Sequence, residues 1–432
     1  MPPHHSGQDQ HRSTSDYGDF AGIVSDDLSS LLSQLYRNHF GKMVAVLMYH
    51  TGIKDIAAAE DIVQEAFAIA SDKWQKNVPD QPGAWLYKTI RNIAYNGLKK
   101  EQRKQVLEDD YIDSDTQPTD DQDVLRVLFA CLQPAFPPKV QLVIVLRYVC
   151  GLRVKRIAAL LASNEDNISK ILYRWRAQHT SESFVLTETT QNPDEQKIRM
   201  AIKILYVMFT EGYQLSEDGH LADEALCEDA LSLLQEMMKM GIVANGEVKA
   251  LYALLLYNLA RADSRTNQLD ELTVLAEQDR TCWNQEMIAV ANHYLLHSQK
   301  ESSAPSAYQL EAAIAYKHTL AVSFEETDWH GIARLYEKLV LANPSPFTKL
   351  SQAAALYFGG DEAGAIKILN QLNANPFFQN YHLIHCFWAK IYHDKNANEN
   401  AMNRYKKALT CQINAFEKKF IEKEIETLSN LR

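Results

Sequence analysis

The sequence predicts an all-α protein divided into several helical units. Apolar residues recur at spacings of three and four along most of the chain, as at Leu28, Leu31 and Leu35, which is the pattern of a helix with one buried face. No stretch alternates apolar and polar residues for long, so no strand is expected. A chain of 432 residues is too long for one ordinary core, and two to four compact units are expected.

The composition is that of a globular intracellular protein. Hydrophobic residues make up 46% of the chain and charged residues 23%, which is enough apolar surface to fold. The polar N-terminus lacks the apolar core of a signal peptide, and the apolar runs are too short to cross a bilayer. None of the six cysteines forms a Cys-x-x-Cys pair. We therefore expect a cytoplasmic protein that has no disulfide framework, no thiolate zinc site and no membrane partner.

The net charge of -11 is unevenly distributed. Residues 28–178 carry 20 Lys and Arg against 17 Asp and Glu, whereas residues 179–432 carry 23 against 33. Only the first of these regions can comfortably approach phosphates, because the acidic remainder repels nucleic acid. The second region is expected to contact protein instead.

Six segments follow from composition and periodicity. Residues 1–27 have no periodicity and predict a disordered tail. Helical patterns cover 28–104, with stretches near 39–51, 56–76 and 82–104. Residues 105–123 contain many Asp and Glu but no Lys or Arg, which indicates a solvated linker. A helical unit at 124–179, a polar linker at 180–194 and a helical extension at 195–432 complete the chain.

The helix expected near residues 56–76 carries a polar face. Asp61, Gln64 and Glu65 share one side of the helix, while Ile62 and Phe67 point elsewhere. A face of this kind is most often only solvated, so it becomes a binding surface only in combination with other features.

The next helix, near residues 82–104, combines positive charge with aromatic rings. Basic side chains neutralise phosphates, aromatic faces stack on unpaired bases, and Asn side chains read base edges. The alternative is a basic surface helix whose Trp belongs to the core. The candidate DNA-binding residues are Trp85, Lys88, Arg91, Asn92, Tyr95, Asn96, Lys99 and Lys100.

Residues 154–178 predict a helix-turn-helix. Its first helix is expected at Val154 to Ala162, its turn at Ser163 to Asp166 and its recognition helix at Asn167 to Gln178. Seven basic residues against two acidic ones in 147–176 favour contact with DNA. The candidate DNA-binding residues are Asn164, Asn167, Lys170, Arg174 and Arg176.

The last hundred residues show a weak repeat. Asn343-Pro344 and Asn375-Pro376 lie 32 residues apart, and Ala365 and Ala401 occupy similar small positions. This period is similar to that of tetratricopeptide helix pairs, which stack into a solenoid with a concave binding surface.

The order of these features resembles the extracytoplasmic-function sigma factors of the sigma-70 family. Residues 59–67 resemble region 2.2, residues 82–100 resemble regions 2.3 and 2.4, and residues 139–178 resemble region 4. Segments such as Phe209 to Tyr213 and Asp279 to Trp283 resemble the group of these factors that carries a tetratricopeptide-like extension. Ile171 and Trp175 depart from the family, which often has Arg and Ala there.

The resemblance implies a fold, partners and residue roles. It implies a region 2 helical bundle, a region 4 helix-turn-helix and a helical-repeat extension. Asp61, Gln64 and Glu65 would bind the β′ clamp helices of core RNA polymerase, and region 4 would meet the β flap. The basic helix would open and read the promoter −10 element, and the recognition helix would read the −35 element. A regulatory protein would bind the extension; no catalytic residue and no cofactor are implied.

Two other functions remain open from the residues. One is a helix-turn-helix regulator with a repeat sensor domain, which binds duplex DNA without polymerase. The other is an enzyme in the C-terminal half, where His293 and His297 have a spacing that can bind a metal on a helix. No third ligand is evident and no phosphate-binding glycine loop appears, so we expect no metal and no enzymatic activity.

Overall fold

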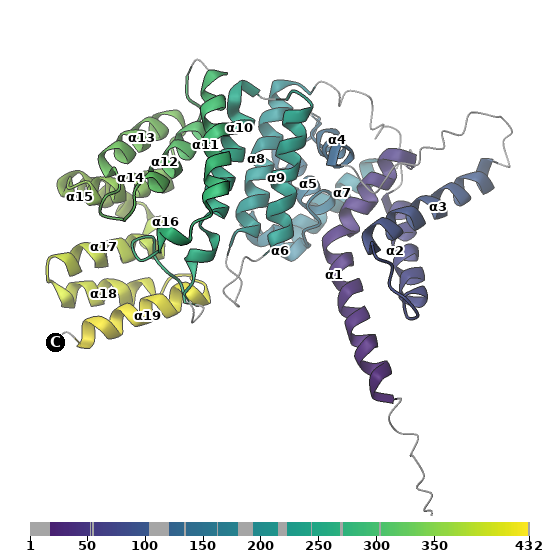
Figure 1. Cartoon of the computed structure of the whole chain (residues 1–432), viewed down its shortest axis with the longest axis horizontal. Helices are drawn as coiled ribbons and strands as arrows, with labels where there is room; N and C mark the ends of the chain where they lie inside the picture. The colour runs from purple at the N-terminus through teal and green to yellow at the C-terminus, as the bar shows by residue number, and fades with distance from the viewer. Residues whose placement is uncertain are drawn as a thin grey trace, which may run out of the picture. The chain divides into compact units, whose positions relative to one another are not determined.

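All regular secondary structure in the described part of the chain is helical, as expected (Figure 1). The computed structural model describes residues 18–51, 53, 56–102, 121–133, 135–161, 163–179, 193–214, 223–242, 244–267, 271–301 and 304–430. The chain forms two compact units, Met1–Lys197 and Ile198–Arg432, and each is treated on its own below.

The first helix, α1 (Gly18–Thr51), differs from the sequence expectation. It begins ten residues before Leu28, inside the range expected to be a disordered tail, and it continues where two helices were predicted. The apolar spacing of Phe20, Val24 and Leu28 explains the earlier start, because it extends the same period backwards. Residues 1–17 of the expected tail lie outside the described residues.

Helices α2 (Ile56–Lys73) and α3 (Pro82–Gln102) pack with α1 in a three-helix bundle. Their bounds agree with the predicted stretches. Buried residues of α2 recur at helical spacing, among them Ala59, Val63 and Ala70. Pro82 occupies the first position of α3, where its missing N–H costs no hydrogen bond.

Four shorter helices follow: α4 (Asp121–Cys131), α5 (Pro138–Tyr148), α6 (Val154–Leu160) and α7 (Glu165–His179). Helix α4 starts at Asp121 instead of Val124, because Asp121 and Asp123 favourably face the N-terminal end of the helix dipole. The rest of the expected acidic linker, 105–120, lies outside the described residues. Gly151 has a φ of 68° in the turn between α5 and α6, a conformation that glycine adopts without strain.

Helix α1 also contacts α4 and α5. At Gly41 its backbone approaches the end of α5 so closely that an added Cβ would lie 2.6 Å from the carbonyl oxygen of Arg147. His50 of α1 lies 2.7 Å from the Asp123 carboxylate of α4. The absence of a side chain at Gly41 therefore allows α5 to pack closely against α1.

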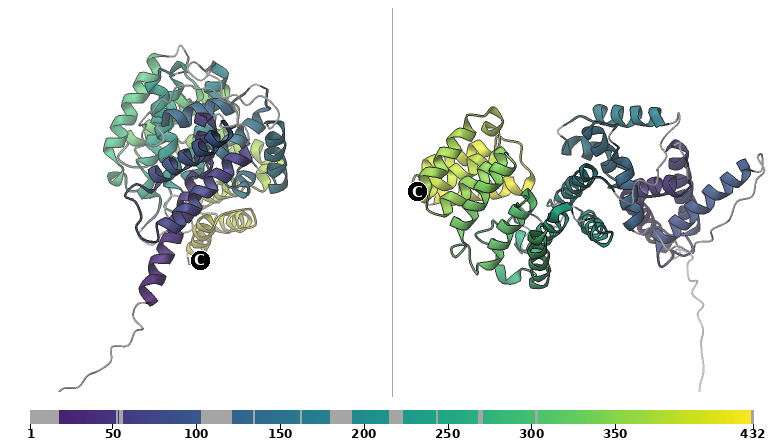
Figure 2. Two further views of the ribbon diagram at one scale, coloured as in Figure 1. Left: turned by 90° about the vertical axis from the view of Figure 1, so that its right-hand side faces the viewer. Right: turned by 90° about the horizontal axis from the view of Figure 1, so that it is seen from above.

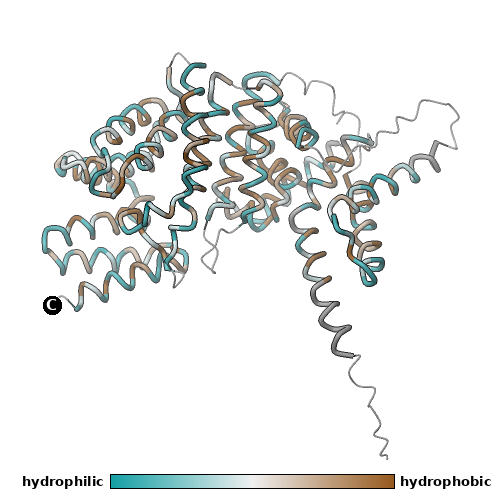
Figure 3. Tube along the Cα trace, viewed as in Figure 1, coloured by the Kyte–Doolittle hydropathy of each residue, from teal (hydrophilic) through white to brown (hydrophobic). Residues whose placement is uncertain are grey.

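The second unit starts within α8 (Glu195–Gly212) and is helical in all its described ranges (Figures 1 and 2). Residues 180–192 of the linker expected before it lie outside the described residues. Brown apolar positions recur along the helices of this unit (Figure 3). The further α-helices are α9 (Glu224–Lys239), α10 (Glu247–Leu259), α11 (Gln285–Lys300), α12 (Ala307–Leu320), α13 (Trp329–Ala342), α14 (Pro346–Phe358), α15 (Glu362–Asn373), α16 (Pro376–Gln379), α17 (His382–Asp394), α18 (Asn398–Ala408) and α19 (Ala415–Asn430), with short 3-10 turns at Ala244–Gly246, Ala262–Arg265 and Arg280–Cys282.

Two helix hairpins of this unit, α14–α15 and α17–α18, are equivalent. The turns between their helices contain Gly360 and Asn396, both with positive φ and 36 residues apart. Ala365 and Ala401, also 36 residues apart, are fully buried near the start of each second helix. The two Asn-Pro pairs differ in their capping, because Asn343 caps the end of α13 whereas Asn375 caps the start of α16.

No helix in the described ranges combines the length and the apolar character that a bilayer crossing requires.

Candidate nucleic-acid interface

The predicted acidic face of α2 is exposed. Asp61, Gln64 and Glu65 all lie on the solvent side of the helix, opposite Val63 and Ala66, which are buried against the bundle. The apolar side fixes the rotation of α2, and the two carboxylates and the amide therefore form one continuous polar surface. Such a surface can bind a basic partner.

The exposed side of α3 carries most of the predicted basic and polar residues. Leu86, Ile90 and Ala94 recur every four residues and are buried, which turns the opposite face outwards. That face bears Lys88, Asn92, Tyr95 and Asn96, all exposed, and Arg91 is half-buried beside them; this surface is called the α3 stripe below. The side chains of Lys99 and Lys100 lie outside the described residues.

Trp85 lies at the start of α3 and is only partly buried. Its ring packs edge-to-face on that of Trp74, with 5.3 Å between the centroids and 68° between the planes. Trp74 itself is buried and follows α2 directly. This contact holds Trp85 in a fixed orientation while part of its ring stays open for a stacking partner.

Helix α7 packs with α6 in the segment predicted as a helix-turn-helix, and it begins at Glu165, two residues before the predicted start of the recognition helix. Ile168, Leu172 and Trp175 point into the core. Asn164 differs from its predicted role, because its Oδ1 accepts a hydrogen bond of 2.8 Å from the backbone N–H of Asn167 and so caps the helix. It remains exposed at the end that a recognition helix presents to base edges.

The exposed face of α7 carries Asn167, Lys170 and Arg174. Tyr173 lies with them, is 72% exposed and was missed by the sequence reasoning. Its position three residues after Lys170 places it on the same helical face, a signal that could have identified it.

Arg176 lies apart from this exposed face, although the sequence groups it with the other candidate DNA-binding residues. Its Nη2 donates to Glu60 Oε1 of α2 at 2.6 Å, and its Nε donates to the hydroxyl of Tyr148 at 3.0 Å. The Tyr148 ring packs in turn on the buried Trp175, with centroids 5.4 Å apart. Arg176 therefore joins α7 to α2 and α5 while its side chain stays partly exposed.

The two histidines weighed as metal ligands lie together on α11. The rings of His293 and His297 are 4.1 Å apart, and His297 Nδ1 lies 2.7 Å from the carbonyl oxygen of His293. Within the described ranges, no group of three or more side chains is arranged to hold a metal ion. The pair is therefore a local contact in this structure.

Comparison with known proteins identifies the bundle that carries these surfaces. The family described as Sigma-70 region 2 matches residues 35–104. The chain contains a sigma-70 region 2 domain. This domain covers part of α1 and all of α2 and α3, so the acidic face of α2 and the α3 stripe both belong to it. The match supports a member of the sigma-70 family that acts in transcription initiation with RNA polymerase and promoter DNA.

Two curated proteins and a second family add to this picture. The RNA polymerase sigma factor SigV of Bacillus subtilis is 27% identical over 124 residues, which is 28% of this chain and 74% of that protein. An uncharacterized protein of Rhizobium meliloti is 27% identical over 401 residues, 90% of this chain and 93% of that one. Residues 197–299 match a family of unknown function (DUF6596). No solved structure matches the chain.

Proposed function

We propose that this protein is an extracytoplasmic-function sigma factor. It binds core RNA polymerase, recognises the −10 and −35 promoter elements, opens the DNA and starts transcription, and its C-terminal helical unit regulates this activity. The proposal rests above all on the α3 stripe, which combines cations, amides and an exposed aromatic ring within a sigma-70 region 2 domain.

The chemistry of the α3 stripe suits an opened DNA strand. Lys88 and Arg91 neutralise phosphates, and Tyr95 offers a ring that is 41% exposed to an unpaired base. A base stacked on an aromatic side chain contributes about 1–3 kcal/mol, which offsets the few kcal/mol needed to unstack it from the duplex. Trp85 extends this surface at the start of the helix. The predicted −10 contacts follow from these properties.

In this proposal the helix-turn-helix of α6 and α7 binds the duplex of the −35 element. Asn167 lies near the N-terminus of α7, the part of a recognition helix that meets base edges. Lys170 and Arg174 follow on the same exposed face and can pair with phosphates or guanine. In this proposal α7 enters the major groove of the −35 element, and region 4 rests on the β flap of the polymerase.

Docking on polymerase uses the acidic face of α2. Asp61, Gln64 and Glu65 are exposed and adjacent, so they can bind a basic helical surface such as the β′ clamp helices without moving any buried residue. The chain itself makes and breaks no covalent bond in this scheme, and it acts in the cytoplasm.

The C-terminal unit is proposed to be a tetratricopeptide-like regulator. The equivalent hairpins α14–α15 and α17–α18 resemble stacked helix pairs, an architecture that builds extended protein-binding surfaces. The relative from Rhizobium meliloti matches 93% of its own length to this chain. That extent supports an extension that acts together with region 2 and not a chance fusion.

Transcription in vitro with core polymerase and a promoter panel tests the proposal. The full chain should direct promoter-dependent transcripts, and Asp61→Asn combined with Glu65→Gln should lower both transcription and co-purification with core enzyme. Glu337→Gln removes an exposed carboxylate on α13, outside region 2 and the helix-turn-helix, and is the matched control for polymerase binding. Duplex binding with no affinity for polymerase would instead support a helix-turn-helix regulator with a sensor domain.

A further inference from the structure

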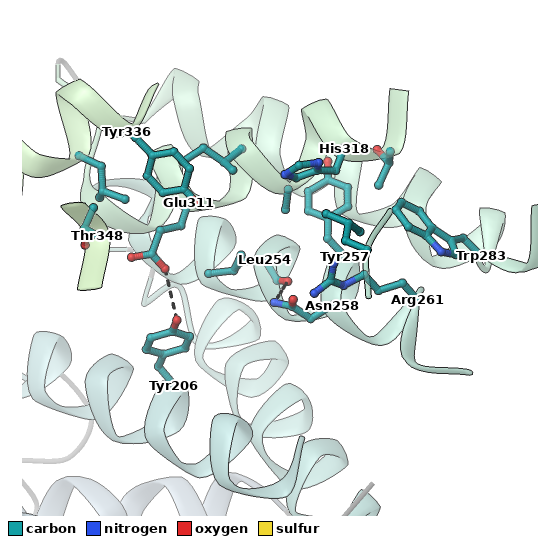
Figure 4. Close-up of a pocket in the computed structure, with 15 residues that line it drawn as sticks. Tyr206, Leu254, Tyr257, Asn258, Arg261, Trp283, Glu311, His318, Tyr336 and Thr348 are labelled. Carbon is teal, nitrogen blue, oxygen red and sulfur yellow. Dashed lines mark hydrogen bonds between the residues drawn. The ribbon is translucent and has the colours of Figure 1, made fainter. Parts of the chain in front are cut away.

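The C-terminal unit contains a cavity of about 410 Å³. Its walls come from α8, α10, α12, α13 and α14 and from the segments between α10 and α11 that carry Arg261 and Trp283 (Figure 4). Leu254, Ile314 and Leu339 are among its apolar side chains. The volume equals that of about 14 molecules of liquid water, and ligand pockets of proteins start near 300 Å³. The cavity therefore has room for a small organic molecule.

One end of the cavity holds a carboxylate that has few hydrogen-bond partners. Glu311 of α12 accepts a single hydrogen bond among the described residues, from the hydroxyl of Tyr206 at a long 3.4 Å. Burial raises the pKa of Glu311 to about 7. Figure 4 shows the rings of Tyr206 and Tyr336 beside this carboxylate. A carboxylate beside an aromatic ring such as that of Tyr336 is a suitable site for an ammonium group, which gains an ion pair and a cation–π contact.

The other end holds a cation without a partner. Arg261 lines the cavity, and within the described part of the chain its guanidinium makes no hydrogen bond or ion pair. The neighbouring Arg280 differs, because it donates to the carbonyl oxygens of His318 and Ala321 and to the hydroxyl of Thr327. Arg261 is thus left available for an anion in the cavity.

His318 lies at the same end as Arg261 (Figure 4). Its Nδ1 is buried and has no hydrogen-bond partner among the described residues. Burial lowers the pKa of His318 to about 4, helped by the charges of Arg261 and Arg280, so the ring is neutral near pH 7. A neutral imidazole and a guanidinium together offer hydrogen bonds to a carboxylate.

The two ends select for charge. A purely anionic ligand would be repelled by the carboxylate of Glu311, and a purely cationic ligand would be repelled by Arg261, and both of these charges are partly shielded from water. We propose that the cavity binds a small zwitterion of amino-acid or dipeptide size, whose carboxylate pairs with Arg261 and His318 and whose ammonium group pairs with Glu311 between Tyr206 and Tyr336. This inference does not depend on the proposed sigma function.

Calorimetric titration of the full chain tests this site. The probes are the proteinogenic L-amino acids and a set of dipeptides, each taken singly, followed by the N-acetyl and carboxamide forms of the tightest binder. At least one zwitterion should bind, and removal of either charge should weaken binding by about tenfold or more, since a hydrogen bond to a charged group is worth roughly that factor. Failure of every probe to bind would overturn the proposal, and so would equal binding of the blocked forms.

Two variants locate the site. Arg261→Met and Glu311→Gln keep the side-chain volume and should each weaken binding by about tenfold or more. Arg334→Met and Glu337→Gln make the same changes at exposed positions of α13 outside the cavity and should leave binding unchanged. Equal loss in both pairs would place the ligand elsewhere and contradict the inference. The blocked ligands test the site with the unaltered chain, should a variant fail to fold.

Discussion

Arg176 and Glu60 form an ion pair across 2.6 Å although 116 residues separate them in the chain. Glu60 lies on α2, within the residues that match sigma-70 region 2, and Arg176 lies on α7 of the predicted helix-turn-helix. The side chain of Glu60 is 18% exposed and that of Arg176 is 39% exposed. Water screens a pair of this exposure only partly, so it should link the two groups of helices measurably.

A double-mutant cycle should detect this link. Glu60→Gln and Arg176→Met should show a coupling energy of about 0.5–1 kcal/mol in the free energy of unfolding of the first unit, because the pair is half-exposed. Arg174→Met is the matched control, since Arg174 is exposed two positions away on the same helix. A coupling between Glu60 and Arg174 as large as that with Arg176 would contradict the geometry.

The two arginines of α7 should also differ in DNA binding. Arg174→Met should weaken binding to a −35 duplex and reduce the slope of log K against log salt by about 1, because an exposed cation that pairs with a phosphate releases a counterion. Arg176→Met should change the slope much less, because Glu60 and Tyr148 already engage its guanidinium. Fluorescence anisotropy at several salt concentrations measures both slopes. Equal slope changes would mean that Arg176 leaves Glu60 when DNA binds.

Tyr95 should contribute to single-strand binding through its ring face. Tyr95→Leu should weaken binding of a −10 oligonucleotide by about 1–3 kcal/mol, whereas Tyr95→Phe should retain most of the affinity because the π-face remains. The side chain is exposed on α3, so neither change disturbs the core. Equal losses in the two variants would assign the role to the hydroxyl group instead.

The stability of the second unit should depend on the ionisation of Glu311. Its pKa is about 7 in the folded chain, above its ordinary value of 4.5. The folded state therefore favours the protonated form, and stability is lost as the pH rises from about 4.5 towards 7. Glu311→Gln should remove this loss. The free energy of unfolding of the variant, relative to that of the wild type, should therefore rise by about 3 kcal/mol between pH 4.5 and 8. Chemical denaturation at a series of pH values measures the difference.

The groups around Glu311 sharpen this test. Tyr206, Tyr308 and Tyr336 face it and stay protonated, because burial raises their own pKa values, while Arg261 lines the same cavity. The Tyr206 hydroxyl lowers the pKa of Glu311, so Tyr206→Phe should move the loss of stability to higher pH. A pH profile that is the same for wild type and Glu311→Gln would contradict the raised pKa.

Periodicity predicted the parts of the fold that depend on one helix at a time. The polar faces of α2 and α3 follow from the spacing of Val63 and Ala66 and of Ile90 and Ala94, so the exposed positions of Asp61 and Tyr95 could be inferred. The start of α1 was missed because the helical pattern was taken to begin at Leu28, although Phe20 and Val24 extend the same apolar period backwards.

Contacts between helices were beyond the reach of the sequence. Arg176 was placed with Arg174 because both are basic and near in sequence, yet a shift of two residues turns a side chain by about 200° around a helix. The cavity near Glu311 was not predicted at all, because its walls come from several helices and connecting segments whose facing sides no local pattern specifies. Tyr173 could have been found from its spacing alone.

The glycine at position 41 limits how related sequences can vary. Any side chain there would collide with the carbonyl oxygen of Arg147, so a homologue with a bulkier residue at this site must hold α5 farther from α1. A one-residue insertion in α1 before Gly41 would have the same consequence, because it rotates the glycine away by about 100°. Natural length differences in this protein's relatives should therefore fall outside α1. A relative with an insertion in α1 before this glycine should hold α5 farther from α1.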